Sequence, residues 1–290
     1  MEEMSHLDDV LKRLPRQTDE NEIRIVKLIR EQLLKTEWAK SIFEALRQQL
    51  IQYFISSIEI LNQPDKIHQA TQEVLEELST ISRSRIVSGE ENLDRLSKRS
   101  PVIAVVNHLG TYKLTEIQPR EIRIDLPLDI IHPFPIYYAP LVPVAKILED
   151  NLYETHVELP EPLLSIQKAA GIIVVPPDQG ALTKLQTATS ELITQHPNAL
   201  ITIFPEGGTT GKRNNGGPYD LDEFKTGGFV IASHLNLPVL PVCQYFNPES
   251  GFELGILPPV KVENTENREY YKELARSTQA SMQSWLNSRK

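Results

Sequence analysis

Apolar residues recur at helical spacing through the first part of the chain. Between residues 20 and 61 there is neither proline nor glycine, and apolar side chains return every three or four positions. The sequence QPDK at 63–66 interrupts this pattern, with Asp65 as the predicted N-cap of a second helix that continues to Ile81. We therefore predict a helical hairpin or small bundle over residues 1–85. Its expected role is packing, and a membrane-surface or partner-binding role is the alternative.

From about Ile86 the pattern changes to short apolar runs that alternate with longer amphipathic segments. The runs are nearly continuous in apolar residues, which is typical of buried parallel strands. Predicted strands cover residues 102–107, 128–131, 171–176, 200–205 and 239–246. Predicted helices cover residues 162–170, 178–195, 224–236 and about 267–288. This alternation predicts an α/β domain over residues 86–290, with a mixed, mainly parallel sheet flanked by helices.

Composition and charge exclude several classes of protein. The 290 residues include 30 Lys and Arg against 39 Asp and Glu, a net charge of -9. Phosphate backbones require clustered basic residues, so we expect no nucleic-acid partner. No stretch approaches the ~20 apolar residues of a membrane span, and the charged start MEEMSHLDDVLKR lacks the apolar core of a signal peptide. We expect a cytoplasmic protein, or a plastid-stroma protein in a eukaryote, with peripheral membrane contact left open.

The sequence contains no recognisable metal-binding motif. Cys243 is the single cysteine, so it can form neither an internal disulfide nor a cysteine-based metal site, and a reducing compartment is expected. There is no His-Glu-x-x-His motif. A serine hydrolase lacks support, because the chain contains no Gly-x-Ser-x-Gly elbow. We interpret His132, His156 and His234 as structural or exposed.

Three segments of the α/β region combine strand ends with residues that can carry chemistry. Asn107 and His108 end the first predicted strand, where ligands bind in open α/β sheets, and this histidine is a candidate general base. The segment FPEGGTTGKRNNGG begins at Phe204 and leads from a strand into a glycine-rich loop that can approach an anion. It is not a P-loop, because the glycine spacing is one residue short and Arg213 replaces the required Ser or Thr. The third segment, FKTGGF, begins at Phe224 and precedes the strand sequence LPVLPV.

The order and spacing of these segments resemble the lysophospholipid/glycerol-3-phosphate acyltransferase (PlsC-like) superfamily. That family has Asn-His-x-x-x-x-Asp at a strand end, where this chain has Asn107 and His108. It has Phe-Pro-Glu-Gly-Thr-Arg-Ser later, where residues 204–207 match, and then an F-K-x-G-x-F helix start and a V-P-I-V-P-V strand. The resemblance covers about residues 86–262. The helical N-terminal region is similar in kind to the extension of soluble plastid-type glycerol-3-phosphate acyltransferases.

This resemblance implies an O-acyltransferase that moves a fatty acyl group from an acyl thioester to a hydroxyl of a glycerolipid precursor or related acceptor. In the family the histidine removes the hydroxyl proton, and the aspartate orients the ring and stabilises its charged form. No metal or cofactor takes part, and the partners are the acceptor and a donor, either acyl-CoA or acyl carrier protein. We assign substrate binding to Asn107, Lys113, Glu206, Gly207, Gly208, Thr209, Thr210, Lys212, Arg213 and Lys225.

The chain departs from the family where the proton is handled. Lys113 stands five residues after His108, at the position of the family's aspartate, and an ammonium can neither accept a hydrogen bond from imidazole nor favour imidazolium. Glu116 is the nearest replacement carboxylate, about one helical turn further on. We therefore predict His108 and Glu116 as the catalytic residues. The alternative is a catalytically impaired relative that binds a lipid or an acyl carrier.

A second departure concerns the acceptor phosphate. Thr209 and Thr210 stand at or beside the place of the family's phosphate-binding arginine, and Lys212 and Arg213 come slightly later. The family's second block usually has an arginine near a strand end, where this chain has Asp178. A phosphorylated acceptor is therefore not implied.

Overall fold

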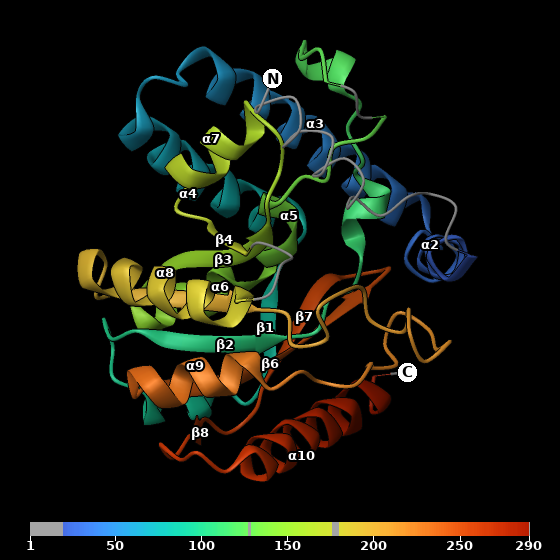
Figure 1. Ribbon diagram of the computed structural model, residues 1–290. Helices are drawn as coiled ribbons and strands as arrows, with labels where there is room; N and C mark the ends of the chain where they lie inside the picture. The colour runs from blue at the N-terminus through green and yellow to red at the C-terminus, as the bar shows by residue number, and fades with distance from the viewer. Residues whose placement is uncertain (1–19, 127–128, 176–179, 290) are drawn as a thin grey trace.

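The computed structural model describes residues 20–126, 129–175 and 180–289, and an eight-stranded sheet forms its centre (Figure 1). The strands are β1 (Arg85–Ser88), β2 (Val102–Val106), β3 (Asn151–Val157), β4 (Ile173–Val175), β5 (Ala199–Ile203), β6 (Pro238–Asn247), β7 (Gly251–Ile256) and β8 (Val260–Lys261). Their order is β1-β7-β6-β2-β5-β3-β4, with β8 paired to β6 outside this path. Within the described chain, β7 and β8 are antiparallel to β6 and the other pairs are parallel. The predicted α/β class is confirmed.

Helices surround this sheet. The N-terminal helices are α2 (Glu20–Leu33), α3 (Glu37–Glu59) and α4 (Pro64–Ile81). The later α-helices are α5 (Pro135–Tyr138), α6 (Val142–Leu148), α7 (Leu163–Ala169), α8 (Ala181–Gln195), α9 (Gly227–Leu235) and α10 (Arg268–Asn287). The 3-10 helices are η1 (Glu90–Arg95), η2 (Thr111–Leu114), η3 (Pro119–Ile122) and η4 (Ala139–Leu141). In Figure 1, α8, α9 and α10 lie side by side along the sheet, and α4 contacts α3, α5 and α7. Buried residues of α2, α3, α4 and the sheet belong to one core.

Four of the five predicted strands occur, as β2, β4, β5 and β6. The strand predicted at 128–131 does not form over the described residues 129–131, where Ile131 makes only an isolated bridge with Ile117. Pro133 and Pro135 follow, and proline cannot donate to a strand ladder. Strands β1, β3, β7 and β8 were not predicted. The pattern concealed β3 because its polar residues Glu154 and His156 are buried.

Residues 20–85, the described part of the N-terminal region, form three helices where the pattern indicates two. Thr36 separates α2 from α3, and its hydroxyl accepts a 3.0 Å hydrogen bond from the Ala39 amide as the N-cap of α3. No proline or glycine marks this break. The predicted cap Asp65 is wrong, because Pro64 starts α4 and Gln63 is its N-cap, which places Asp65 in the first turn.

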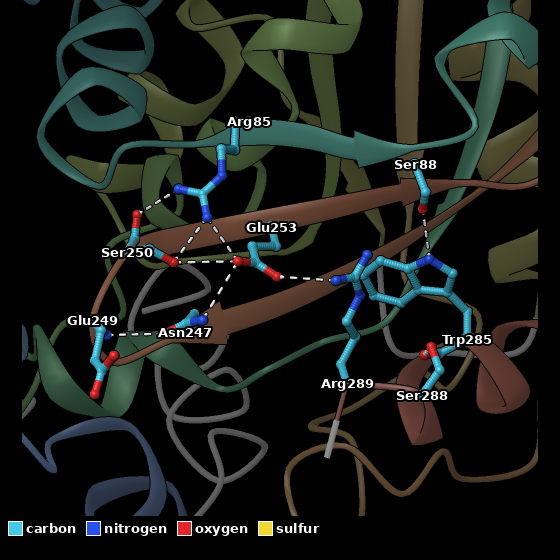
Figure 2. A network of polar contacts seen from close by, with 9 residues as sticks. All are labelled: Arg85, Ser88, Asn247, Glu249, Ser250, Glu253, Trp285, Ser288 and Arg289. Atoms are coloured by element: carbon cyan, nitrogen blue, oxygen red, sulfur yellow. Dashed lines mark hydrogen bonds and ion pairs between the residues drawn. The ribbon is translucent and has the colours of Figure 1, made fainter.

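A polar network attaches the C-terminal helix α10 to the edge strand β1 and its neighbour β7 (Figure 2). The indole of Trp285 donates a 2.8 Å hydrogen bond to the Ser88 hydroxyl. The Glu253 carboxylate on β7 accepts a 2.7 Å hydrogen bond from Arg85 and lies 3.7 Å from the Arg289 guanidinium. Gly255 permits this packing, because a Cβ at that position would overlap the Trp285 ring. The last helix therefore completes the fold at the sheet edge.

Candidate functional site

The first two motif segments meet at the carboxyl edge of the sheet. Residues 107 and 108 follow β2 and residues 204–210 follow β5, and these strands are parallel neighbours. The amide of Thr210 donates a 2.8 Å hydrogen bond to the His108 carbonyl, which joins the two loops. The sequence predicts this location, since parallel strands bring their carboxyl ends to the same edge.

Asn107 fastens the first loop to the neighbouring strand β6. Its amide oxygen accepts a 2.7 Å hydrogen bond from the Gln244 backbone amide, and its amide nitrogen donates a 3.0 Å hydrogen bond to the Gln244 carbonyl. The side chain is fully buried. Both ends of its amide are used within the protein, which favours a structural role, and the assignment of Asn107 to substrate binding stays a prediction.

The imidazole of His108 is enclosed by aromatic rings. Its centroid lies 5.7 Å from that of Tyr112, 4.9 Å from that of Tyr137 and 4.7 Å from that of Phe204. Part of the residue still faces solvent. The Nδ1 atom accepts a 3.1 Å hydrogen bond from the Gly110 amide, so in the neutral ring the proton resides on Nε2. Burial, followed by the charge of a protonated His156, lowers the pKa of His108 to about 4.

Glu116 makes no hydrogen bond with the imidazole among the described residues, and its catalytic role stays a prediction. Its carboxylate forms an ion pair of 3.6 Å with Lys113. In the described part of the chain, neither nitrogen of the His108 ring bonds a carboxylate. The cause is local geometry, because η2 is a 3-10 turn that ends at Leu114 and leaves Glu116 beyond it. Burial raises the pKa of Glu116, although the charge of Lys113 opposes this.

Lys113 and Lys212 are directed to the N-terminal helix. The Lys113 ammonium is buried, 3.3 Å from the carboxylate of Glu22 on α2. Lys212 lies 2.6 Å from the same carboxylate, and the Tyr112 hydroxyl donates a 3.0 Å hydrogen bond to it. An internal carboxylate thus takes the charge of both lysines, and their assignment to substrate binding stays a prediction. The residue that sequence reasoning missed is Glu22.

Glu206 joins three segments from a fully buried position. Its carboxylate accepts hydrogen bonds from the His108 amide at 3.3 Å, the Thr210 hydroxyl at 2.6 Å and the Asp222 amide at 2.8 Å. Burial raises the pKa of Glu206 to about 7, although these hydrogen bonds oppose the rise. The enclosed carboxylate holds the two motif loops together, and its assignment to substrate binding stays a prediction.

Thr209 and Thr210 also act within the protein. Both are buried, and the Thr209 hydroxyl lies 3.4 Å from that of Tyr112. The Thr210 hydroxyl accepts a 3.0 Å hydrogen bond from the His108 amide while it donates to Glu206. Both hydroxyls thus have partners inside the protein, and their assignment to substrate binding stays a prediction.

The turn at Gly207 and Gly208 remains accessible and is flanked by two cations. Gly207 adopts φ +64°, and a Cβ there would overlap the Lys225 ammonium. Arg213 donates hydrogen bonds of 2.6 Å and 3.0 Å to the carbonyls of Glu206 and Gly207. Lys225 and Arg213 are both exposed. Partial burial of Lys225, followed by the nearby charge of Arg213, lowers the pKa of Lys225. Of the assigned substrate-binding residues, Gly207, Arg213 and Lys225 are exposed, and Gly208 and Lys212 are half-buried.

The other histidines have different surroundings. His156 is buried, and its Nδ1 lies 2.9 Å from the Gln167 amide nitrogen. His132 lies edge-on to Tyr112, and His234 is exposed on α9. Asp178, noted in the second motif block, lies outside the described residues. Within these residues no cluster of His, Cys, Asp or Glu could hold a metal ion, and no helix is long and apolar enough to cross a membrane.

Comparison with known proteins adds one solved structure to this description. The chain is similar to the crystal structure of the 1-acyl-sn-glycerophosphate (LPA) acyltransferase, PlsC, from Thermotoga maritima. The TM-score is 0.45 and the identity is 16%, over 85% of this chain and 97% of that chain. Neither a family model nor a curated protein matches the sequence. At this level of likeness, function rests on the side chains of the site.

Proposed function

We propose that this protein is an acyltransferase that carries a fatty acyl group from a thioester to a hydroxyl acceptor. The observation that carries the proposal is the meeting of His108 with the turn at Gly207 and Gly208 at the carboxyl edge of β2 and β5. His108, a half-buried residue, lies there beside a glycine turn flanked by the cations Arg213 and Lys225. Such a turn suits the phosphates that acyl-CoA and acyl carrier protein both contain.

In the proposed reaction His108 Nε2 removes the proton of the acceptor hydroxyl while the oxygen attacks the thioester carbonyl carbon. The tetrahedral intermediate collapses, the carbon–sulfur bond breaks, and the sulfur leaves with the proton held by the imidazolium. The products are an ester and a free thiol. No covalent enzyme intermediate forms. The acyl group passes from sulfur to oxygen, and the proton passes from the hydroxyl through His108 to the sulfur.

This mechanism requires a change at the imidazole. A base at Nε2 needs the proton on Nδ1, whereas Nδ1 accepts a hydrogen bond from Gly110. The buried surroundings also disfavour imidazolium, as the pKa of about 4 expresses. An active enzyme therefore breaks the Gly110 bond when substrates bind. The same two observations favour a second candidate function, a relative that binds an acyl thioester without turnover.

A thiol-release assay tests the proposed activity. Acyl-CoA and acyl carrier protein are each offered with glycerol-3-phosphate, a lysophospholipid and neutral alcohols. We expect wild type to release thiol with at least one pair, and His108→Ala to lose about 10² to 10⁴ in rate. His234→Ala is the matched control, because His234 is exposed on α9. Transfer by His108→Ala at the wild-type rate, or no thiol release by wild type with any pair, overturns the proposal.

Nitrogen NMR of the His108 ring separates the two candidates. In the free protein we expect an unprotonated Nδ1 at pH 7 and a titration near pH 4. An unreactive acyl thioether is then added as a ligand. If the protein is an acyltransferase, we expect the ring proton to move to Nδ1; if it only binds the thioester, we expect the proton to stay on Nε2. Lys113→Asp is a poor discriminator, because it would place a third carboxylate beside Glu22 and Glu116.

A further inference from the structure

A carboxylate of the N-terminal helix occupies a set of donors next to the candidate catalytic ring. Tyr112, Lys113 and Lys212 all face Glu22, at distances of 3.0, 3.3 and 2.6 Å, and are called the anion receptor below. The Tyr112 ring also lies against the His108 ring. Two ammonium groups and a hydroxyl that converge on one carboxylate form a donor set suited to a carboxylate or a phosphate. The receptor therefore has the chemistry of a ligand site.

Glu22 is held in the receptor as an ion. Burial alone would raise its pKa, but the hydrogen bond from Lys212 and the charges of Lys113 and Lys212 keep the pKa below its ordinary value. The side chain is nearly inaccessible to solvent, at 4% relative exposure for the residue. An anionic ligand cannot share the receptor with it, because two like charges would lie in contact at low dielectric.

The helix that carries Glu22 is fixed against the site. Its inner face is fully buried through Ile25, Ile29 and Leu33. The Arg24 guanidinium donates hydrogen bonds of 2.7 Å and 2.6 Å to the carbonyls of Gly211 and Gly216 in the loop after β5. Ile29 packs closely on Gly110, whose amide bonds the His108 ring. α2 therefore contacts both motif loops and keeps the carboxylate in place.

We infer that Glu22 keeps the anion receptor filled and thereby excludes a phosphate or carboxylate of the acceptor from this side of His108. As far as it names an acceptor, this inference rests on the proposed acyl transfer. The acceptor is then an alcohol that is uncharged near its reacting hydroxyl. Glu22 is a specificity-determining residue supplied by the N-terminal region.

Replacing the internal carboxylate with a free one tests the receptor directly. Glu22→Ala removes a fragment of the size of acetate, and the melting temperature is measured in acetate and in chloride at equal ionic strength. We expect a loss of roughly 5–10 °C, because the buried Lys113 loses a partner. Acetate restores at least half of the loss with saturation, and chloride does not. Inorganic phosphate is a second probe of the receptor.

The control is Glu31→Ala, which removes an exposed α2 carboxylate that lies 3.8 Å from Lys27. Acetate should leave this variant and wild type unchanged. Equal effects of acetate and chloride on Glu22→Ala, or equal stabilisation of wild type by acetate, overturn the inference. If Glu22→Ala does not fold in buffer, its refolding yield is compared in the two salts, and equal yields overturn the inference in the same way.

Acceptor preference tests the functional part. We expect wild type to favour a neutral alcohol over glycerol-3-phosphate by at least about tenfold in kcat/KM, and Glu22→Ala to shift this ratio by at least about tenfold towards the phosphate. Preference of wild type for glycerol-3-phosphate overturns the exclusion and leaves the proposed acyl transfer intact. No turnover with any acceptor overturns the proposed function, and the acetate experiment still decides whether the receptor exists.

Discussion

The buried carboxyl of Glu206 makes the pH dependence of stability a direct test of how the site is built. In the folded protein burial raises its pKa from 4.5 to about 7. The folded state therefore holds this proton more tightly than the unfolded chain does. The stabilisation is complete below pH 4.5 and is lost as the pH rises through 7. Glu206→Gln removes the titration and keeps the shape of the side chain.

The size of the effect follows from the two pKa values. Each tenfold change in proton affinity corresponds to about 1.4 kcal/mol, so the rise from 4.5 to about 7 corresponds to about 3 kcal/mol. The amide also loses part of the hydrogen bonding to His108, Thr210 and Asp222, which lowers stability by a similar amount at every pH. Only the first effect depends on pH, so a comparison across pH separates the two.

The assay is urea unfolding of wild type and Glu206→Gln at intervals from pH 4 to 8. We expect the unfolding free energy of wild type to fall by about 3 kcal/mol more than that of the variant over this range. Glu149→Gln is the control of opposite sign, because hydrogen bonds from Lys98 and Arg99 lower the pKa of Glu149 on the surface. Parallel profiles for wild type and Glu206→Gln would show that burial of this carboxyl is wrongly assigned.

Two further substitutions test the framework of the site. Asn107→Ala leaves the amide and carbonyl of Gln244 without their partners, so we expect a loss of about 2–4 kcal/mol in urea unfolding, and wild-type stability would contradict the structural role. Gly255→Ala forces the Trp285 ring away from β7, so we expect the free energy of unfolding to fall by about 1–3 kcal/mol. Gly227→Ala is the control and should cost little, because the atom nearest to its new Cβ would lie 3.7 Å away. Equal melting temperatures of the two variants would refute the packing of Trp285 on Gly255.

The central strands could be predicted because both of their faces are covered. β2 and β5 are continuous apolar runs and lie in the middle of the sheet, where burial leaves no alternation to find. β3 lies next to β5 but carries Glu154 and His156 inside, so its composition resembles a surface segment. β7 contains glycine at both Gly251 and Gly255, which is unfavourable for a strand in general. Long-range packing against Trp285 explains the second of these.

The location of the site could be predicted, whereas most of its contacts could not. Asn107 and His108 follow directly after a strand, so they lie at the carboxyl edge of any parallel sheet that this strand joins. Their partners depend on loops and helices far away in sequence. One signal was nevertheless available for Glu22: it falls three residues before Ile25 and seven before Ile29, on the apolar stripe of its helix. A charge on a stripe that packs inward predicts a buried partner of opposite charge.

Lys113 and Lys212 are related through the charge of Glu22. A lysine at the aspartate position suggests an eroded motif if Lys113 is considered with His108 alone. If a lysine had replaced an aspartate here with no other change, its buried ammonium would lack a partner, and the folded state would lose about 3–5 kcal/mol of stability. Here the ammonium pairs with Glu22, and the same carboxylate takes the charge of Lys212 from the second motif loop. Lys113, Lys212 and Glu22 thus form one balanced cluster of charges.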